Sequence, residues 1–177
     1  MNITNEDNMD LMSRYEDNHF DLAIVDPPYG IERFKKGGSI INKHGDETRL
    51  WNNEKPTKEY FDELFRVSKK QIIWGANNFD LPTSEYFIIW QKGNALDFSF
   101  AMVEQAWTNV KKPAKLFKHL HAQNREVRIL DTHLGSGSIA IAAHNLGYDL
   151  TACELDKEYF EAAMQRIERH KQQLTMF

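Results

Sequence analysis

The stretch VRILDTHLGSGSIAIAAHNLGYDLTACE, residues 127–154, decides the fold of this chain. It begins with a short apolar run at 127–130, which predicts a buried strand. Small and apolar residues fill positions 138–146 and predict a helix, which Gly147 is placed to end. A second apolar run at 150–153 predicts another strand. A strand, a helix and a strand in this order indicate a crossover unit of a parallel sheet.

The same alternation of strands and helices extends through the rest of the chain. Apolar spacing predicts helices over 5–18, 57–70 and 156–171, and strands over 20–25, 71–74, 86–90 and 104–110, with those at 71–74 and 86–90 buried. We therefore expect a single α/β domain with a mostly parallel sheet flanked by helices. The segment from Gly30 to Asn53 has little periodicity, which predicts a long surface loop.

Composition narrows the class of protein. A chain of 177 residues, 41% apolar and 27% charged, can bury one sizeable core. A net charge of −4 argues against a strongly basic nucleic-acid coat. The sequence has no signal-peptide pattern and no apolar run long enough to span a membrane, and seven histidines without metal-ligand spacing predict no structural zinc. The single Cys153 has no internal disulfide partner, which favours a reducing cytoplasm.

Acidic residues stand at both strand tips of the stretch 127–154. Asp131 can receive the ammonium group of a ligand, and Glu154 can accept hydrogen bonds from the two hydroxyls of a ribose. The glycine loop between them lets a ligand approach the backbone closely. The loop residues expected to bind the ligand are His133, Gly135, Ser136, Gly137 and Ser138. These features suit a ligand made of a nucleoside and an amino acid, and they suit a pyrophosphate less well. The alternative is that the GxG loop makes only a tight turn.

A second motif, Asp26-Pro27-Pro28-Tyr29, follows the apolar run at 20–25. The Asp26 carboxylate and the Pro27 carbonyl can accept the two N–H groups of an exocyclic base amine, which frees the nitrogen lone pair for attack. Pro28 stiffens this arrangement in advance, and Tyr29 offers a flat face on which the base can stack. The alternative is a rigid turn with Tyr29 in the core. Because both motifs follow apolar strands, we expect them side by side at one edge of the sheet.

These two motifs resemble the DNA amino-methyltransferases, whose fingerprints are a D/N/S-PPY/W tetrapeptide and a DxFxGSGT-like cofactor loop. Here they read DPPY at 26–29 and DTHLGSGS at 131–138, in the order of the beta-class adenine enzymes. The segments at 63–79 and 154–167 are also similar to that class.

The resemblance implies a Rossmann-like methyltransferase fold, with a catalytic half at 1–118 before a cofactor half at 119–177. It also implies S-adenosylmethionine (SAM) as cofactor, and DNA as a partner whose adenine flips into the site for methylation at N6. An aspartate at position 26 resembles adenine enzymes more than cytosine-N4 enzymes. The candidate contacts to the DNA strand are Lys35 and Lys36.

The chain also departs from the family pattern. An HPTQKP-like segment before the cofactor strand is absent, and His133 stands where an aromatic or apolar residue is usual. The junction from Lys111 to Val127 is short for a target-recognition region, which predicts either a minimal member or residues missing between about Lys118 and Leu120.

Other functions stay open at this point. The same chemistry serves cytosine-N4 enzymes and RNA base amino-methyltransferases, and a cofactor- or DNA-binding relative without activity would retain the motifs. A homodimer and a restriction partner are compatible with the sequence. The basic cluster of Lys111, Lys112, Lys115 and Lys118 suits phosphate contacts or a solvated surface. A dinucleotide-binding oxidoreductase is disfavoured because it would leave DPPY unexplained.

Overall fold

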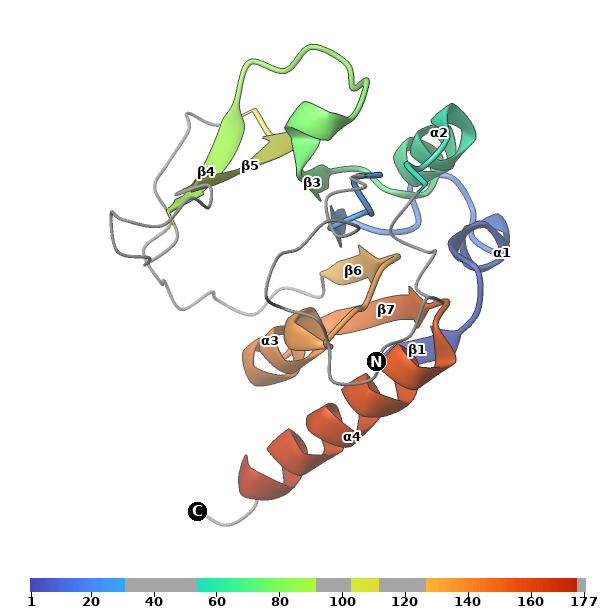
Figure 1. Cartoon of the computed structure of the whole chain (residues 1–177), viewed down its shortest axis with the longest axis vertical. Helices are drawn as coiled ribbons and strands as arrows, with labels where there is room; N and C mark the ends of the chain where they lie inside the picture. Colours follow the sequence, from blue (N-terminus) through green and yellow to red (C-terminus); the bar gives the residue numbers. More distant parts are fainter. Residues whose placement is uncertain (31–53, 92–102, 112–126, 175–177) are drawn as a thin grey trace, which may run out of the picture.

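A computed structural model describes residues 1–30, 54–91, 103–111 and 127–174 of the chain (Figure 1). The elements in chain order are β1 (Asn2–Asn5), α1 (Asn8–Ser13), β2 (Leu22–Val25), α2 (Lys58–Val67), β3 (Gln71–Trp74), the 3₁₀ turn η3 (Ala76–Asn78), β4 (Phe87–Gln91), β5 (Val103–Thr108), β6 (Arg128–Asp131), α3 (Ser138–Leu146), β7 (Asp149–Glu154) and α4 (Lys157–Leu174). They form one sheet with helices on both of its faces.

Across the described residues the sheet has seven strands, in the order β1-β7-β6-β2-β3-β5-β4. The five strands from β1 to β3 run parallel to one another, whereas β5 pairs antiparallel with both β3 and β4. This topology confirms the expected α/β class and the mostly parallel sheet. It also places β2, which precedes DPPY, directly beside β6, which precedes the glycine loop.

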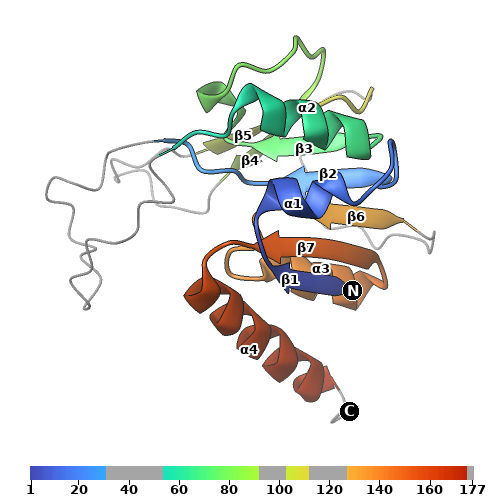
Figure 2. The ribbon, with the colours of Figure 1, turned by 90° about the vertical axis from the view of Figure 1, so that its right-hand side faces the viewer.

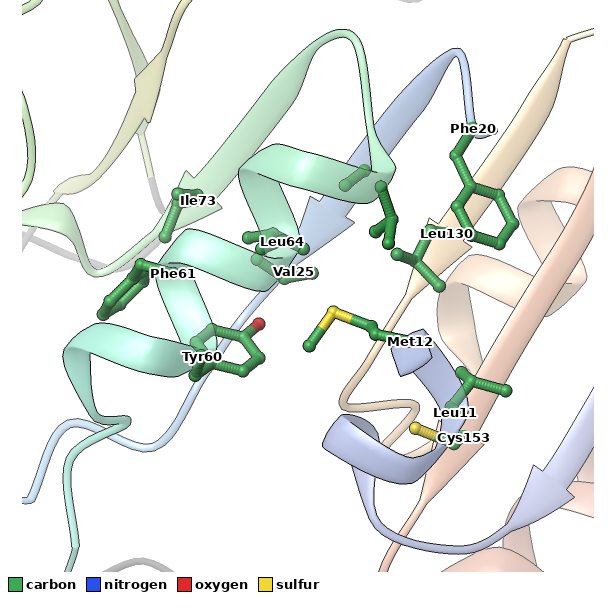
Figure 3. Close-up of a cluster of buried hydrophobic side chains, with 12 residues drawn as sticks. Leu11, Met12, Phe20, Val25, Tyr60, Phe61, Leu64, Ile73, Leu130 and Cys153 are labelled. Atoms are coloured by element: carbon green, nitrogen blue, oxygen red, sulfur yellow. The ribbon is translucent and has the colours of Figure 1, made fainter. Parts of the chain in front are cut away.

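Helices α1 and α2 cover one face of the sheet, and α3 lies on the other (Figure 2). Helix α4 packs with α3 in the second core. Figure 3 shows the first core, where Leu11, Met12, Tyr60, Phe61 and Leu64 of the helices pack against Val25, Ile73 and Leu130 of the strands. The second core joins Ala140, Ala143, Ala163 and Ile167 of α3 and α4 to Ile129, Leu150 and Ala152. Neighbouring residues of a strand point to opposite faces, so the short apolar runs of β6 and β7 serve both cores.

Local sequence signals account for the helices. In α2 the buried residues Tyr60, Phe61, Leu64 and Val67 recur at helical spacing on one side. Helix α3 has the predicted bounds because Gly147 adopts a left-handed backbone at its end, with φ of +70°. The helix expected over 5–18 is much longer than α1, which spans only Asn8–Ser13, whereas the helix expected over 156–171 differs from α4 by a few residues.

Two sequence expectations need correction. The sequence predicts a helix from Asn5 and no strand before it, yet Asn2–Asn5 forms β1, which pairs with β7 as an edge strand, and the helix begins only at Asn8. The apolar run at 86–90 was expected to be buried. Instead β4 is the opposite edge strand, and Phe87 and Trp90 are 42% and 54% exposed. An edge strand is paired on one side only, and periodicity alone does not reveal that position.

Several expectations fall outside the described residues. These are the loop from Gly30 to Asn53 beyond its first residue, the contacts of Lys35 and Lys36, the lysines at 112, 115 and 118, and the short junction before Val127. Within the part that is described, no helix has the length and apolarity needed to cross a membrane.

Candidate functional site

Four neighbouring parallel strands end at the same edge of the sheet, in the spatial order β7, β6, β2 and β3. The residues at or just beyond their carboxyl ends are Glu154, Asp131, Asp26 and Gly75. In the register of β2 and β6, Ala23 pairs with Leu130. The two motifs therefore follow adjacent strands, as expected, and this edge is where ligands bind in open α/β sheets.

The glycine loop after β6 is held against the end of β7. The Leu134 amide donates to the Cys153 carbonyl at 3.0 Å, and the Gly137 amide donates to the Leu134 carbonyl at 3.0 Å. The Gly135 amide donates to the Glu154 carboxylate at 2.8 Å. Glu154 thus faces the loop from the end of the neighbouring strand.

Helix α4 supports the other side of the loop. A Cβ on Gly137, whose φ is +75°, would lie 3.2 Å from Ile167 and 3.3 Å from Ala163. The Arg166 guanidinium donates to the Ser136 carbonyl at 2.8 Å and to the Ser138 hydroxyl at 3.0 Å. Sequence reasoning did not single out Arg166, because its partner loop lies about thirty residues earlier in the chain.

Asp131 lies beneath this loop and is only 4% exposed. Burial, with smaller contributions from the charges of Glu154 and Asp26, raises the pKa of its carboxyl to about 7, against the lowering effect of the His133 amide, which donates to it at 3.0 Å. The smallest of these contributions comes from Asp26, at the end of the neighbouring strand. A cationic ligand here would favour the ionised form of Asp131.

His133 belongs to a hydrogen-bonded chain between the two halves of the fold. Its Nδ1 lies 2.9 Å from the Thr132 hydroxyl, which in turn lies 2.7 Å from the Tyr60 hydroxyl on α2. Its Nε2 lies 3.3 Å from the side-chain nitrogen of Asn8 on α1. Burial lowers the pKa of His133 to about 4, so the ring is neutral at pH 7. Sequence reasoning missed Tyr60, Thr132 and Asn8 as neighbours of the loop.

The DPPY motif leaves β2 in an extended form with trans peptide bonds. Pro27 is buried, Pro28 and Tyr29 are half-buried, and Asp26 is exposed. The Tyr29 hydroxyl donates a hydrogen bond to the Asp26 carboxylate. Burial and this bond both raise the pKa of Tyr29 above its usual value. Tyr29 is thus only partly in the core, and its hydroxyl end reaches the carboxylate.

The arrangement defines what this edge can do chemically. Asp26, Asp131 and Glu154 make it acidic, which favours a positively charged ligand and groups that donate N–H or O–H bonds. No cluster of three or more metal-ligating side chains occurs among the described residues.

Comparisons with known proteins agree with this architecture. No protein-family model and no curated protein matches the chain. Among solved structures, M1.HpyAVI in complex with SAM has 19% sequence identity and a TM-score of 0.57, over 93% of this chain and 97% of that one.

Two further solved structures are similar. A Thermus thermophilus protein assigned as a DNA modification methylase, also in complex with SAM, has 14% identity and a TM-score of 0.56, over 96% of this chain and 93% of that one. The cytosine-N4-specific DNA methyltransferase PvuII has 10% identity and a TM-score of 0.57, over 96% of this chain and 89% of that one. The chain therefore has the α/β fold of these methyltransferases.

Proposed function

We propose that this protein transfers a methyl group from SAM to the exocyclic N6 amine of adenine in DNA. The observation that carries the proposal is the position of DPPY beside the acidic cofactor edge. Asp26 and Asp131 follow adjacent parallel strands, and the charge of Asp26 contributes to the raised pKa of Asp131. A methyl donor held at one strand end and an acceptor amine held at the next can meet with little motion.

The acidic edge supports the choice of cofactor. In this proposal Asp131 receives the ammonium group of the cofactor, and Glu154 accepts hydrogen bonds from its ribose hydroxyls. The glycine loop supplies backbone that a ligand can approach closely, and Ser136 and Ser138 flank that approach. When bound, SAM supplies a methyl group on a positively charged sulfur, and the acidic edge stabilises that charge. Two of the similar structures were solved with SAM.

The DPPY motif prepares the acceptor nitrogen. The Asp26 carboxylate accepts one N–H of the amine, and the Pro27 carbonyl accepts the other, so that the lone pair points away from the ring. The Tyr29 ring stacks on the base. In the unbound protein the Tyr29 hydroxyl donates a hydrogen bond to the Asp26 carboxylate, which orients that carboxylate before the base enters. The base amine then takes the place of the Tyr29 hydroxyl as hydrogen-bond donor to Asp26. The exposed position of Asp26 gives the proton released by the nitrogen a route to water.

Adenine is favoured over cytosine by the aspartate at position 26, in line with the resemblance to adenine enzymes. Methylation of cytosine at N4 is the second candidate, because the cytosine-N4-specific PvuII methyltransferase shares the fold. The two candidates use the same acceptor geometry and differ in the base that is methylated.

The test is nucleoside analysis after incubation with methyl-labelled SAM. The purified protein is given DNA and RNA in separate reactions, and each is digested to nucleosides. We expect label in N6-methyladenine from DNA. Label in N4-methylcytosine would establish the second candidate, label only in RNA would change the substrate class, and absence of both SAM binding and label would refute an enzymatic role.

A further inference from the structure

Gly75, the first residue after β3, lies directly against the ring of Tyr29. A Cβ built on Gly75 would lie 2.0 Å from Cε1, 2.5 Å from Cζ and 2.7 Å from Cδ1 of Tyr29. Real carbon atoms do not approach this closely, so even the methyl group of alanine cannot share the space with the ring. The ring occupies its present position only because residue 75 has no side chain.

The backbone of Gly75 is fixed on both sides and cannot easily withdraw. Its amide donates to the Gln105 carbonyl of β5 at 3.0 Å. Its carbonyl accepts bonds from the Asn78 amide at 2.9 Å and from the Asn78 side chain at 3.0 Å. A side chain at position 75 would therefore displace Tyr29 and leave the end of β3 in place.

The Tyr29 ring is in turn held where the DPPY motif requires it. Its hydroxyl donates to Asp26, and its centroid lies 6.0 Å from that of Phe79, which follows η3. Phe79 packs against Phe61 of the first core, with centroids 5.4 Å apart. Gly75 and Phe79 thus both border the ring, while the Asp26 carboxylate receives its hydroxyl.

We propose that Gly75 is a positioning residue for methyl transfer, which acts by leaving room for the Tyr29 ring beside Asp26. The proposal rests on the function given above and extends it to a strand that carries neither motif. Gly75 touches neither base nor cofactor in this account. Its effect passes entirely through Tyr29.

Backbone strain is the competing explanation for any defect at this position. Gly75 has a φ of +67°, so every other residue is strained there regardless of contacts. Gly147 provides the matched control, because its φ is +70° and a Cβ added to it would meet nothing within 4 Å. Gly147→Ala introduces the same strain without the collision.

The experiment compares Gly75→Ala, Gly147→Ala, Tyr29→Ala and the double variant Gly75→Ala/Tyr29→Ala. Thermal unfolding, SAM affinity, and kcat and KM for DNA are measured for each. We expect Gly75→Ala to lower kcat/KM by about tenfold or more, the size of one lost base-stacking contact, with SAM affinity unchanged within about twofold. Gly147→Ala should retain the wild-type kcat/KM.

The double variant decides whether the effect passes through Tyr29. We expect its kcat/KM to equal that of Tyr29→Ala alone, because the group that Gly75 accommodates is already absent. An equal loss from Gly75→Ala in both backgrounds would overturn the proposal, as would a fully active Gly75→Ala.

Folding defects are also informative. If Gly75→Ala unfolds while the double variant folds, the collision with Tyr29 is confirmed, and if both unfold, strain is the cause and the proposal fails. A wild-type protein that binds SAM but methylates no nucleic acid would instead remove the proposed function itself.

Discussion

At the scale of single residues, Asp131 and His133 respond to pH in opposite directions. Burial and nearby carboxylates raise the pKa of Asp131 from 3.8 to about 7, so between these values unfolding releases a proton and stability falls as the pH rises. Burial lowers the pKa of His133 from 6.5 to about 4, so unfolding takes up a proton and stability rises across that window. The two effects oppose each other between about pH 4 and pH 6.5.

Asp131→Asn should unmask the contribution of His133. We expect the unfolding midpoint of this variant to rise more steeply between pH 4.5 and pH 6.5 than that of the wild type, because the opposing carboxyl is gone. In His133→Gln the Asp131 contribution remains alone, so the unfolding midpoint should rise less steeply with pH than in the wild type, or fall. Urea titrations across this range measure both slopes, and parallel curves for all three proteins would contradict the assignment.

Asp131 should also make cofactor binding depend on pH. If its ionised form receives the ammonium group of SAM, affinity should increase by about tenfold between pH 5.5 and pH 7, as the carboxyl approaches half ionisation. His133 remains neutral over this range and does not contribute. Calorimetry at the two pH values measures the change, and Asp131→Asn should bind weakly at both. Equal wild-type affinities would argue that the ammonium binds elsewhere.

At the scale of elements, α4 shapes the loop that begins α3. Because the Arg166 guanidinium binds the Ser136 carbonyl and the Ser138 hydroxyl, its removal should loosen the loop. We expect Arg166→Ala to weaken SAM binding about fivefold to tenfold, the effect of losing one or two hydrogen bonds. Arg169→Ala is the control, since Arg169 donates to the Gln165 carbonyl of its own helix. Equal calorimetric affinities for the two variants would show that α4 does not shape the loop.

Element boundaries were predictable where the sequence marks them locally. Helix α3 starts after Gly137 and ends before Gly147, and both glycines adopt positive φ. Strand β1 was missed because the segment NITN is short and polar, and it becomes a strand only by pairing with β7. The exposure of β4 was missed for a related reason, since its place at the sheet edge depends on the strand order.

At the scale of the whole molecule, the sheet brings together sites that are far apart in the sequence. The acids at the strand tips could be predicted because each follows its own apolar run. The contacts of Gly75 with Tyr29, of Arg166 with Ser136, and of Asn8 with His133 could not, because each pair spans separate elements. The spacing of apolar residues predicts the helix or strand to which a residue belongs, whereas these contacts depend on how the elements pack together.

We propose that cofactor binding and acceptor activation belong to the adjacent but separate ends of β6 and β2. Methyl transfer to DNA by Asp26→Ala, measured together with its SAM affinity, tests this claim most directly. We predict loss of transfer by at least about a hundredfold, with SAM affinity within about twofold of the wild type and with activity largely retained in the control Tyr29→Phe. Near-normal turnover by Asp26→Ala would contradict the account.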